Sequence, residues 1–178
     1  MPTVMMRLME VEDDAEAERL YWRIDSVVVR DGSLRPGADA VASCLVQGLI
    51  RATSVARIQI FELLAQLGGG VTPEEFGGQS FSDVVHREVL RGFPFYCEYL
   101  ESASPVERFH CIDLLSLCAY NDRGLKDRTF ALLSRAAELG DRERALVEAI
   151  FRDLDDPAGG PTGESGFGDR SRDLNSAE

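Results

Sequence analysis

One stretch of the chain occurs twice, and this duplication limits the possible folds more than any other feature. The first copy is VARIQIFELLAQL at 55–67 and the second is VERFHCIDLLSLC at 106–118. A valine, an arginine two places later and a Leu-Leu pair fall in register, as do Glu62 and Asp113. Each copy follows another apolar helical stretch, so the repeating unit is a pair of amphipathic helices. Such units bury their apolar faces against neighbouring units, which is typical of helical-repeat arrays that bind partners.

Apolar residues at three- and four-residue steps predict further helices around the two copies. The predicted helices cover 10–29, 37–52, 54–67, 82–101, 104–120, 125–138 and 141–154. We expect a glycine-rich loop over 68–80 and a kink or break at Pro94, which cannot donate an amide hydrogen bond. Val27-Val28-Val29 is compatible with a short strand, but we favour a helix end there.

These patterns predict an all-α fold in two parts. Residues 1–154 form one helical domain. Residues 155–178 are an acidic tail with almost nothing to bury, and we expect this tail to be disordered.

The charge of the chain limits its partners. The net charge is −12, which argues against nucleic acid and against anionic membrane surfaces, because both carry negative charge. It is compatible with a basic protein partner, although acidity alone also serves solubility. No apolar run approaches the roughly 20 residues needed to cross a bilayer, and we predict no signal peptide.

The cysteines and histidines show no recognisable catalytic or metal-binding pattern. Cys44, Cys97, Cys111 and Cys118 are scattered through apolar helical segments, which predicts free, buried thiols and a reducing cytoplasm. His86-Arg87-Glu88 matches H-x-E, but the P-C-x-x-C partner of zinc deaminases is missing, so we expect His86 to be an exposed helix residue. We therefore predict no catalytic residue, no metal site and no cofactor.

Several segments resemble a known group of helical-repeat proteins. The segment LYWRID, followed by VVVRDGSL and an apolar helix pair, resembles HEAT-like proteins from high-GC bacteria. The resemblance covers roughly residues 18–154 and implies a HEAT-like α-α superhelix, a short helical-repeat array. Some related small helical proteins are immunity partners of secreted polymorphic toxins. Pro94 and the 68–80 loop depart from a regular array, so uniform curvature is not implied.

The duplicated residues divide into scaffold and candidate contact residues. We favour a structural role for Arg57 and Arg108, through an acidic partner in a neighbouring unit or a capped turn. Polar residues on the second helices, and one tryptophan, are the weak candidates for partner binding: Gln59, Glu62, Gln66, Glu107, Asp113 and Trp22. Tyr21 and Trp22 are adjacent and must point in different directions. We favour a core position for Trp22, while an exposed tryptophan would be an interface anchor.

The leading hypothesis is a cytoplasmic protein-binding module, most concretely an immunity-type protein that neutralises a basic toxin. One alternative is an enzyme or small-ligand protein with a pocket at the Gly92–Tyr99 break. The other is a self-associating structural array. The oligomeric state stays open.

Overall fold

Nine α-helices and one short β-hairpin make up the part of the chain that the structure describes. The computed structural model describes residues 1–73 and 77–155. In chain order the elements are α1 (Pro2–Glu10), α2 (Asp14–Val28), β1 (Val29–Arg30), β2 (Ser33–Leu34), α3 (Ala38–Gly48), α4 (Ser54–Gly69), α5 (Gln79–Leu90), α6 (Phe93–Ser102), α7 (Pro105–Asn121), η2 (Arg123–Leu125, a 3-10 turn), α8 (Lys126–Ala136) and α9 (Asp141–Asp155). The predicted all-α class is confirmed. Apart from Asp155, the tail predicted to be disordered lies outside the described residues.

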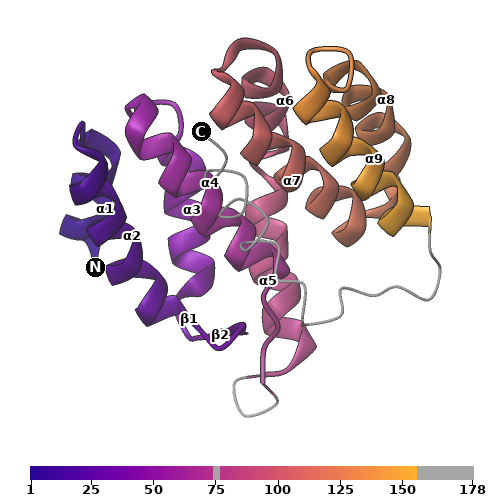
Figure 1. Cartoon of the computed structure of the whole chain (residues 1–178). Coiled ribbons are helices and arrows are strands. Elements are labelled where there is room, and N and C mark those ends of the chain that lie inside the picture. Colours follow the sequence, from indigo (N-terminus) through magenta and orange to yellow (C-terminus); the bar gives the residue numbers. More distant parts are fainter. Residues whose placement is uncertain (74–76, 156–178) are drawn as a thin grey trace.

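The helices pack in two rows that follow the order of the chain (Figure 1). In one row α2 packs on α4, α4 on α7 and α7 on α9. In the other row α1 contacts α3, α3 contacts α5, and α6 contacts α8. The helices of the first row are the second members of successive helix pairs, so the duplicated stretches, which lie in α4 and α7, are neighbours in space.

Three of these second helices begin with the same kind of side-chain cap. Asp13 Oδ1 accepts a hydrogen bond from the Glu16 amide at 2.8 Å, and Thr53 Oγ1 accepts one from the Ala56 amide at 3.1 Å. Ser104 caps α7 and forms a reciprocal capping box with Glu107. Each cap accepts a hydrogen bond from an amide of the first turn and so fixes where its helix starts.

Helix α7 is the most enclosed element. Eleven of its residues are buried, on all sides of the helix: Glu107, Phe109, Cys111, Ile112, Asp113, Leu114, Leu115, Ser116, Leu117, Cys118 and Ala119. Its neighbours are α4, α5, α6, η2, α8 and α9. A helix with partners on every side has no polar face, so the amphipathic pattern predicted for this copy is weak.

The predicted break at Pro94 is confirmed, and an aromatic side chain fills it. Helix α5 ends at Leu90 and α6 begins at Phe93. The Tyr96 hydroxyl donates a hydrogen bond to the carbonyl oxygen of Val89 at 2.9 Å. A Cβ atom on Gly92 would lie 2.2 Å from the Tyr96 hydroxyl oxygen, so glycine is needed at the break.

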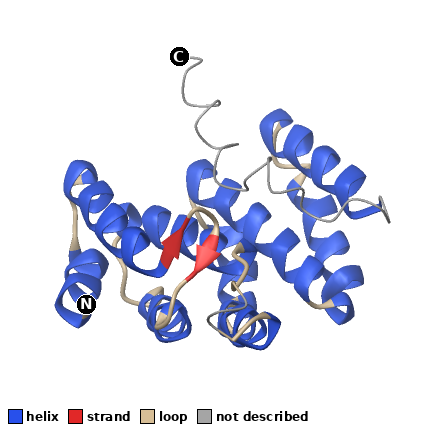
Figure 2. Ribbon diagram, turned by 90° about the horizontal axis from the view of Figure 1, so that it is seen from below, coloured by secondary structure: helices blue, strands red, loops and turns tan. Residues whose placement is uncertain are grey.

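The segment after α2 resolves the choice between strand and helix end. The helix ends at Val28, and Val29–Arg30 then pairs with Ser33–Leu34 as an antiparallel hairpin (red in Figure 2). Asp31 and Gly32 form its turn with φ of 52° and 72°, the left-handed pair that tight hairpins require. Both interpretations of the valine run are therefore partly right.

Helix α1 is an element that the sequence analysis missed. It buries Val4, Met5 and Leu8, and it packs against α2, α3 and α4. Those three residues have the three- and four-residue spacing of a helical face, which was the available signal. With α1 in place, the described chain contains four successive helix pairs, and the break divides the first helix of the third pair.

Candidate binding groove

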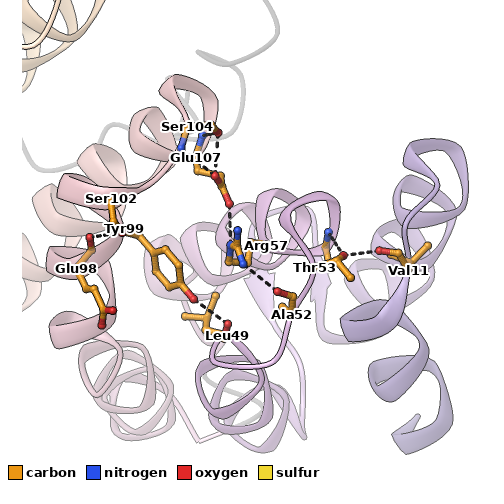
Figure 3. Close-up of polar contacts among 11 residues, drawn as sticks. Val11, Leu49, Ala52, Thr53, Arg57, Glu98, Tyr99, Ser102, Ser104 and Glu107 are labelled. Atoms are coloured by element: carbon orange, nitrogen blue, oxygen red, sulfur yellow. Dashed lines mark hydrogen bonds and ion pairs between the residues drawn. The ribbon is translucent and has the colours of Figure 1, made fainter.

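The duplicated arginines form equivalent contacts between neighbouring units. Arg57 Nε lies 2.7 Å from Glu107 Oε1, so it joins α4 to α7 (Figure 3). Arg108 Nη1 lies 3.2 Å from Glu143 Oε1, so it joins α7 to α9. We call these two ion pairs the arginine ladder. The predicted structural role of Arg57 and Arg108 is confirmed, and the acidic partner does belong to a neighbouring unit.

Each arginine of the ladder also holds the turn before its own helix. Arg57 Nη1 donates to the Ala52 carbonyl at 2.9 Å, and Arg108 Nη2 donates to the Ala103 carbonyl at 3.2 Å. Both carbonyls lie five residues before the arginine. Each guanidinium therefore makes two connections. It holds the turn within its own helix pair, and it joins that pair to the next one.

The ladder ends in the last described pair. Arg144 occupies the position in α9 that Arg108 occupies in α7, directly after a glutamate. Its Nη1 lies 2.8 Å from Asp141 Oδ1 of the same helix, and both side chains are exposed. This surface pair gives a natural comparison with the buried pairs.

Glu107 is held in its charged form inside the scaffold. Burial alone would raise the pKa of its carboxyl, but hydrogen bonds from the Ser104 amide and from the guanidinium of Arg57 bring that pKa below its ordinary value. The Ser104 amide and hydroxyl donate to Glu107 Oε2 at 3.0 and 2.8 Å. The carboxylate thus serves the capping box and the ladder together.

The residues proposed from the sequence for partner binding do not share one surface. Glu107 and Asp113 are only 3% and 5% exposed, so they belong to the interior and cannot present their side chains to a partner. Gln59, Glu62 and Gln66 are half-buried and share one face of α4 by their spacing. Trp22 is 45% exposed, which corrects the expected core position, because Tyr21 takes the buried site beside it.

A long apolar groove lies elsewhere, along α1 and α3. Its volume is about 1010 Å³. All four methionines of the chain line it. The rest of the lining comes from Pro2 of α1, the end of α2, α3 with the turns around it, and Phe95 of α6. The residues of α2, α3 and these turns are Val27, Val28, Pro36, Gly37, Ala40, Val41, Cys44, Val46, Gln47, Gly48, Ile50 and Arg51. We call this the methionine groove.

Close packing of α1 on α3 forms the floor of the groove. A Cβ atom on Gly48 would lie 2.2 Å from Met9 Cε and 2.8 Å from Met9 Sδ, so the glycine gives room for the methionine. Among the other methionines of the lining, Met5 is buried, whereas Met1 and Met6 are exposed. The groove therefore has a packed floor and a rim of flexible thioether side chains, which adapt easily to an apolar partner.

Two tyrosines of the Gly92–Tyr99 break, where one alternative placed a pocket, form hydrogen bonds to backbone carbonyls. Tyr96 fills the break, and Tyr99 is engaged because its hydroxyl donates to the Leu49 carbonyl at 2.9 Å (Figure 3). Phe95 is the one residue of this segment that lines the methionine groove. The other residues that line the groove come from the first 51 residues of the chain, mainly from α1 and α3.

Burial shifts the pKa values of two cysteines and one histidine. Burial raises the pKa of the Cys118 thiol to about 12 and that of the Cys111 thiol well above its ordinary range, which removes the reactive thiolate. Burial, with the nearby Arg142 guanidinium, lowers the pKa of His110 to about 4. His86, expected to be exposed, is half-buried, with Nε2 3.0 Å from the Gly70 carbonyl oxygen.

The described residues contain neither a cluster of metal-ligand side chains nor a helix that could cross a membrane. Within 1–73 and 77–155, no three His, Cys, Asp or Glu side chains are grouped as metal ligands. Over the same described ranges, none of the helices combines the length and the apolar character that crossing a bilayer requires.

Comparisons with protein-family models, with curated proteins and with solved structures found no match to this chain. The function must therefore be argued from the groove and the scaffold that positions it.

Proposed function

We propose that this chain is a HEAT-like helical-repeat module that binds a protein partner through the methionine groove. The groove is the observation that carries the proposal. Four methionines with a few other apolar side chains create an adaptable surface of the kind that accepts an apolar helix face. The arginine ladder supports the proposal, because it gives the helix pairs a fixed arrangement on which such a surface can be presented.

Exposed apolar side chains in the first helix pair support the same function. Arrays of this kind need terminal units with polar outer faces to remain soluble. Helix α9 meets this need with exposed charged residues, among them Arg142, Arg144 and Glu148. The first pair also carries exposed charges along α1 and α2, but Met6 and Trp22 are exposed there as well. Large exposed apolar side chains of this kind are stabilised when a partner covers them.

The finer role that we propose is that of an immunity-type protein in the cytoplasm, which binds and neutralises a basic toxin. The net charge of −12 supports a basic partner, because opposite fields accelerate encounter. All four cysteines are free thiols, which fits a reducing compartment. The prediction that all four are buried is wrong for Cys44, which is exposed, and for Cys97, which is half-buried. The proposal that the partner is a toxin rests on the resemblance to HEAT-like proteins.

A charge placed in the groove tests the proposal. We expect Ile50→Glu, which puts a carboxylate on the apolar rim, to weaken partner binding at least tenfold, because that charge must be desolvated on docking. The matched control is Leu139→Glu, which changes a similarly exposed apolar residue in the turn between α8 and α9. The measurement is copurification from cells, followed by titration with the purified partner.

Three outcomes would contradict the proposal. In the first, no protein copurifies at any salt concentration. In the second, Ile50→Glu and Leu139→Glu reduce binding equally. In the third, the only associated protein is a second copy of the chain, seen as concentration-dependent dimers in sedimentation. For the toxin role, the product of a toxin-like gene directly upstream is the partner to test first.

A further inference from the structure

The exposed rim of the methionine groove indicates what kind of binding partner covers it. Four large apolar side chains of the lining are well exposed: Met1 by 42%, Met6 by 63%, Val27 by 53% and Ile50 by 67%. A small apolar molecule that sinks to the floor would leave this rim in water. Only a partner segment wider than the groove removes both the floor and the rim from water. A helix with its side chains is about 10 Å wide and is such a segment.

The length of the groove matches about three helical turns. Its two walls, α1 and α3, have nine and eleven residues, which at 1.5 Å per residue gives about 14 to 17 Å. Met9 contacts Gly48, so the two walls end side by side. A partner helix of three turns presents apolar residues at positions i, i+3 or i+4, and i+7 along this length.

Arg51 is the one charged side chain among the described residues of the apolar lining. Arg51 follows the end of α3, at the end of the groove where Met9 meets Gly48, and it is exposed. Its side chain forms no ion pair or hydrogen bond with any other residue in the described ranges 1–73 and 77–155. A helix laid over the groove removes water from this guanidinium, and desolvating a charge without a partner is costly.

We infer that the occupant of the groove is an amphipathic helix of about three turns, from the protein partner, that places a carboxylate against Arg51. The inference rests on the proposed function and specifies the partner segment. Methionine side chains discriminate weakly by shape, because they adapt. The single ion pair therefore sets the register of the helix, as a polar contact does in an otherwise apolar interface.

Two synthetic helical peptides of identical composition test this inference. Both carry the same leucines along one face of the helix. In the first peptide, a glutamate lies beside the leucines at one end of that face and a lysine lies on the opposite face. In the second peptide, the glutamate and the lysine are exchanged. Their net charges are equal, so the acidity of the protein does not favour either. Binding is followed by fluorescence anisotropy of labelled peptide, with the full chain.

We expect the peptide with the flanking glutamate to bind the wild-type chain about tenfold more tightly than its partner. Arg51→Glu should reverse this preference. Arg123→Glu makes the same charge change on an exposed arginine of η2, away from the groove, and should leave the preference unchanged.

Each contrary result has a distinct meaning. If Arg51→Glu leaves the relative affinities of the two peptides unchanged, the inferred ion pair does not form. Partner capture that depends on Ile50 would still support the proposed function. If neither peptide binds and a fatty acid such as oleate does, the groove takes a small amphiphile and the inferred helix is wrong. Loss of both peptide binding and Ile50-dependent capture overturns the inference and the proposed function together.

Discussion

Replacing Arg57 with methionine should lower the free energy of unfolding by about 3 kcal/mol. The substitution keeps an apolar stem but leaves the Glu107 carboxylate buried without its cation, and breaking a buried pair from one side typically costs 3–5 kcal/mol. Glu107 is 3% exposed, so water cannot replace the guanidinium. The lower end of that range applies because Ser104 still donates two hydrogen bonds to the carboxylate.

The same change at the end of the ladder is the matched control. Arg144→Met removes the equivalent arginine from an exposed pair with Asp141, and such surface pairs contribute between 0 and about 1 kcal/mol. Both variants are compared with wild type by urea denaturation, with a test that the slope is unchanged. A second variant, Arg57→Met with Glu107→Leu, should recover part of the loss because the unpaired charge is gone. Equal losses for Arg57→Met and Arg144→Met would contradict the role assigned to the ladder.

Acid should destabilise the chain well above the range in which carboxylates titrate. The half-buried imidazole of His110 has a pKa of about 4, whereas an unfolded histidine has a pKa of about 6.5. As the pH falls below 6.5, the unfolded chain takes up this proton first, so stability is lost. The loss relative to neutral pH should reach roughly 2 kcal/mol at pH 5 and about 3 kcal/mol at pH 4.

The variant His110→Gln isolates this effect, because it keeps a polar side chain that does not titrate. Its free energy of unfolding should change less between pH 7 and pH 5 than that of wild type, by roughly the same 2 kcal/mol. An NMR titration of the folded protein checks the pKa directly. A midpoint near 6.5 for His110, or equal pH slopes for both proteins, would contradict the prediction.

The scaffold was predictable from the sequence because its residues repeat. Helix pairs, the break at Pro94 and the structural role of the arginines all followed from periodicity and from the match between the two copies. The acidic partners of the arginines did not, since Glu62 and Asp113 were the aligned acids. The true partners, Glu107 and Glu143, each directly precede an arginine, which is a local signal that becomes informative only when the neighbouring helix is placed beside it.

The binding surface was not predictable in the same way. The groove joins α1 to α3 and Phe95 of α6, and contacts between segments so far apart leave no periodic signal in any one of them. Helix α1 is short, and such helices depend on tertiary packing more than on propensity. Asp113 was misassigned for a related reason: neighbours surround α7, so a polar residue there need not face solvent.

The enclosure of α7 has a consequence for how the molecule opens. The outer pairs, α1 with α2 and α8 with α9, can separate from the array while the middle keeps its packing, so their amides should exchange with deuterium through local opening. Helix α7 contacts α4, α6, α8 and α9, and no partial opening exposes its backbone fully. Its amides should therefore be the last to exchange, at a rate set by global unfolding.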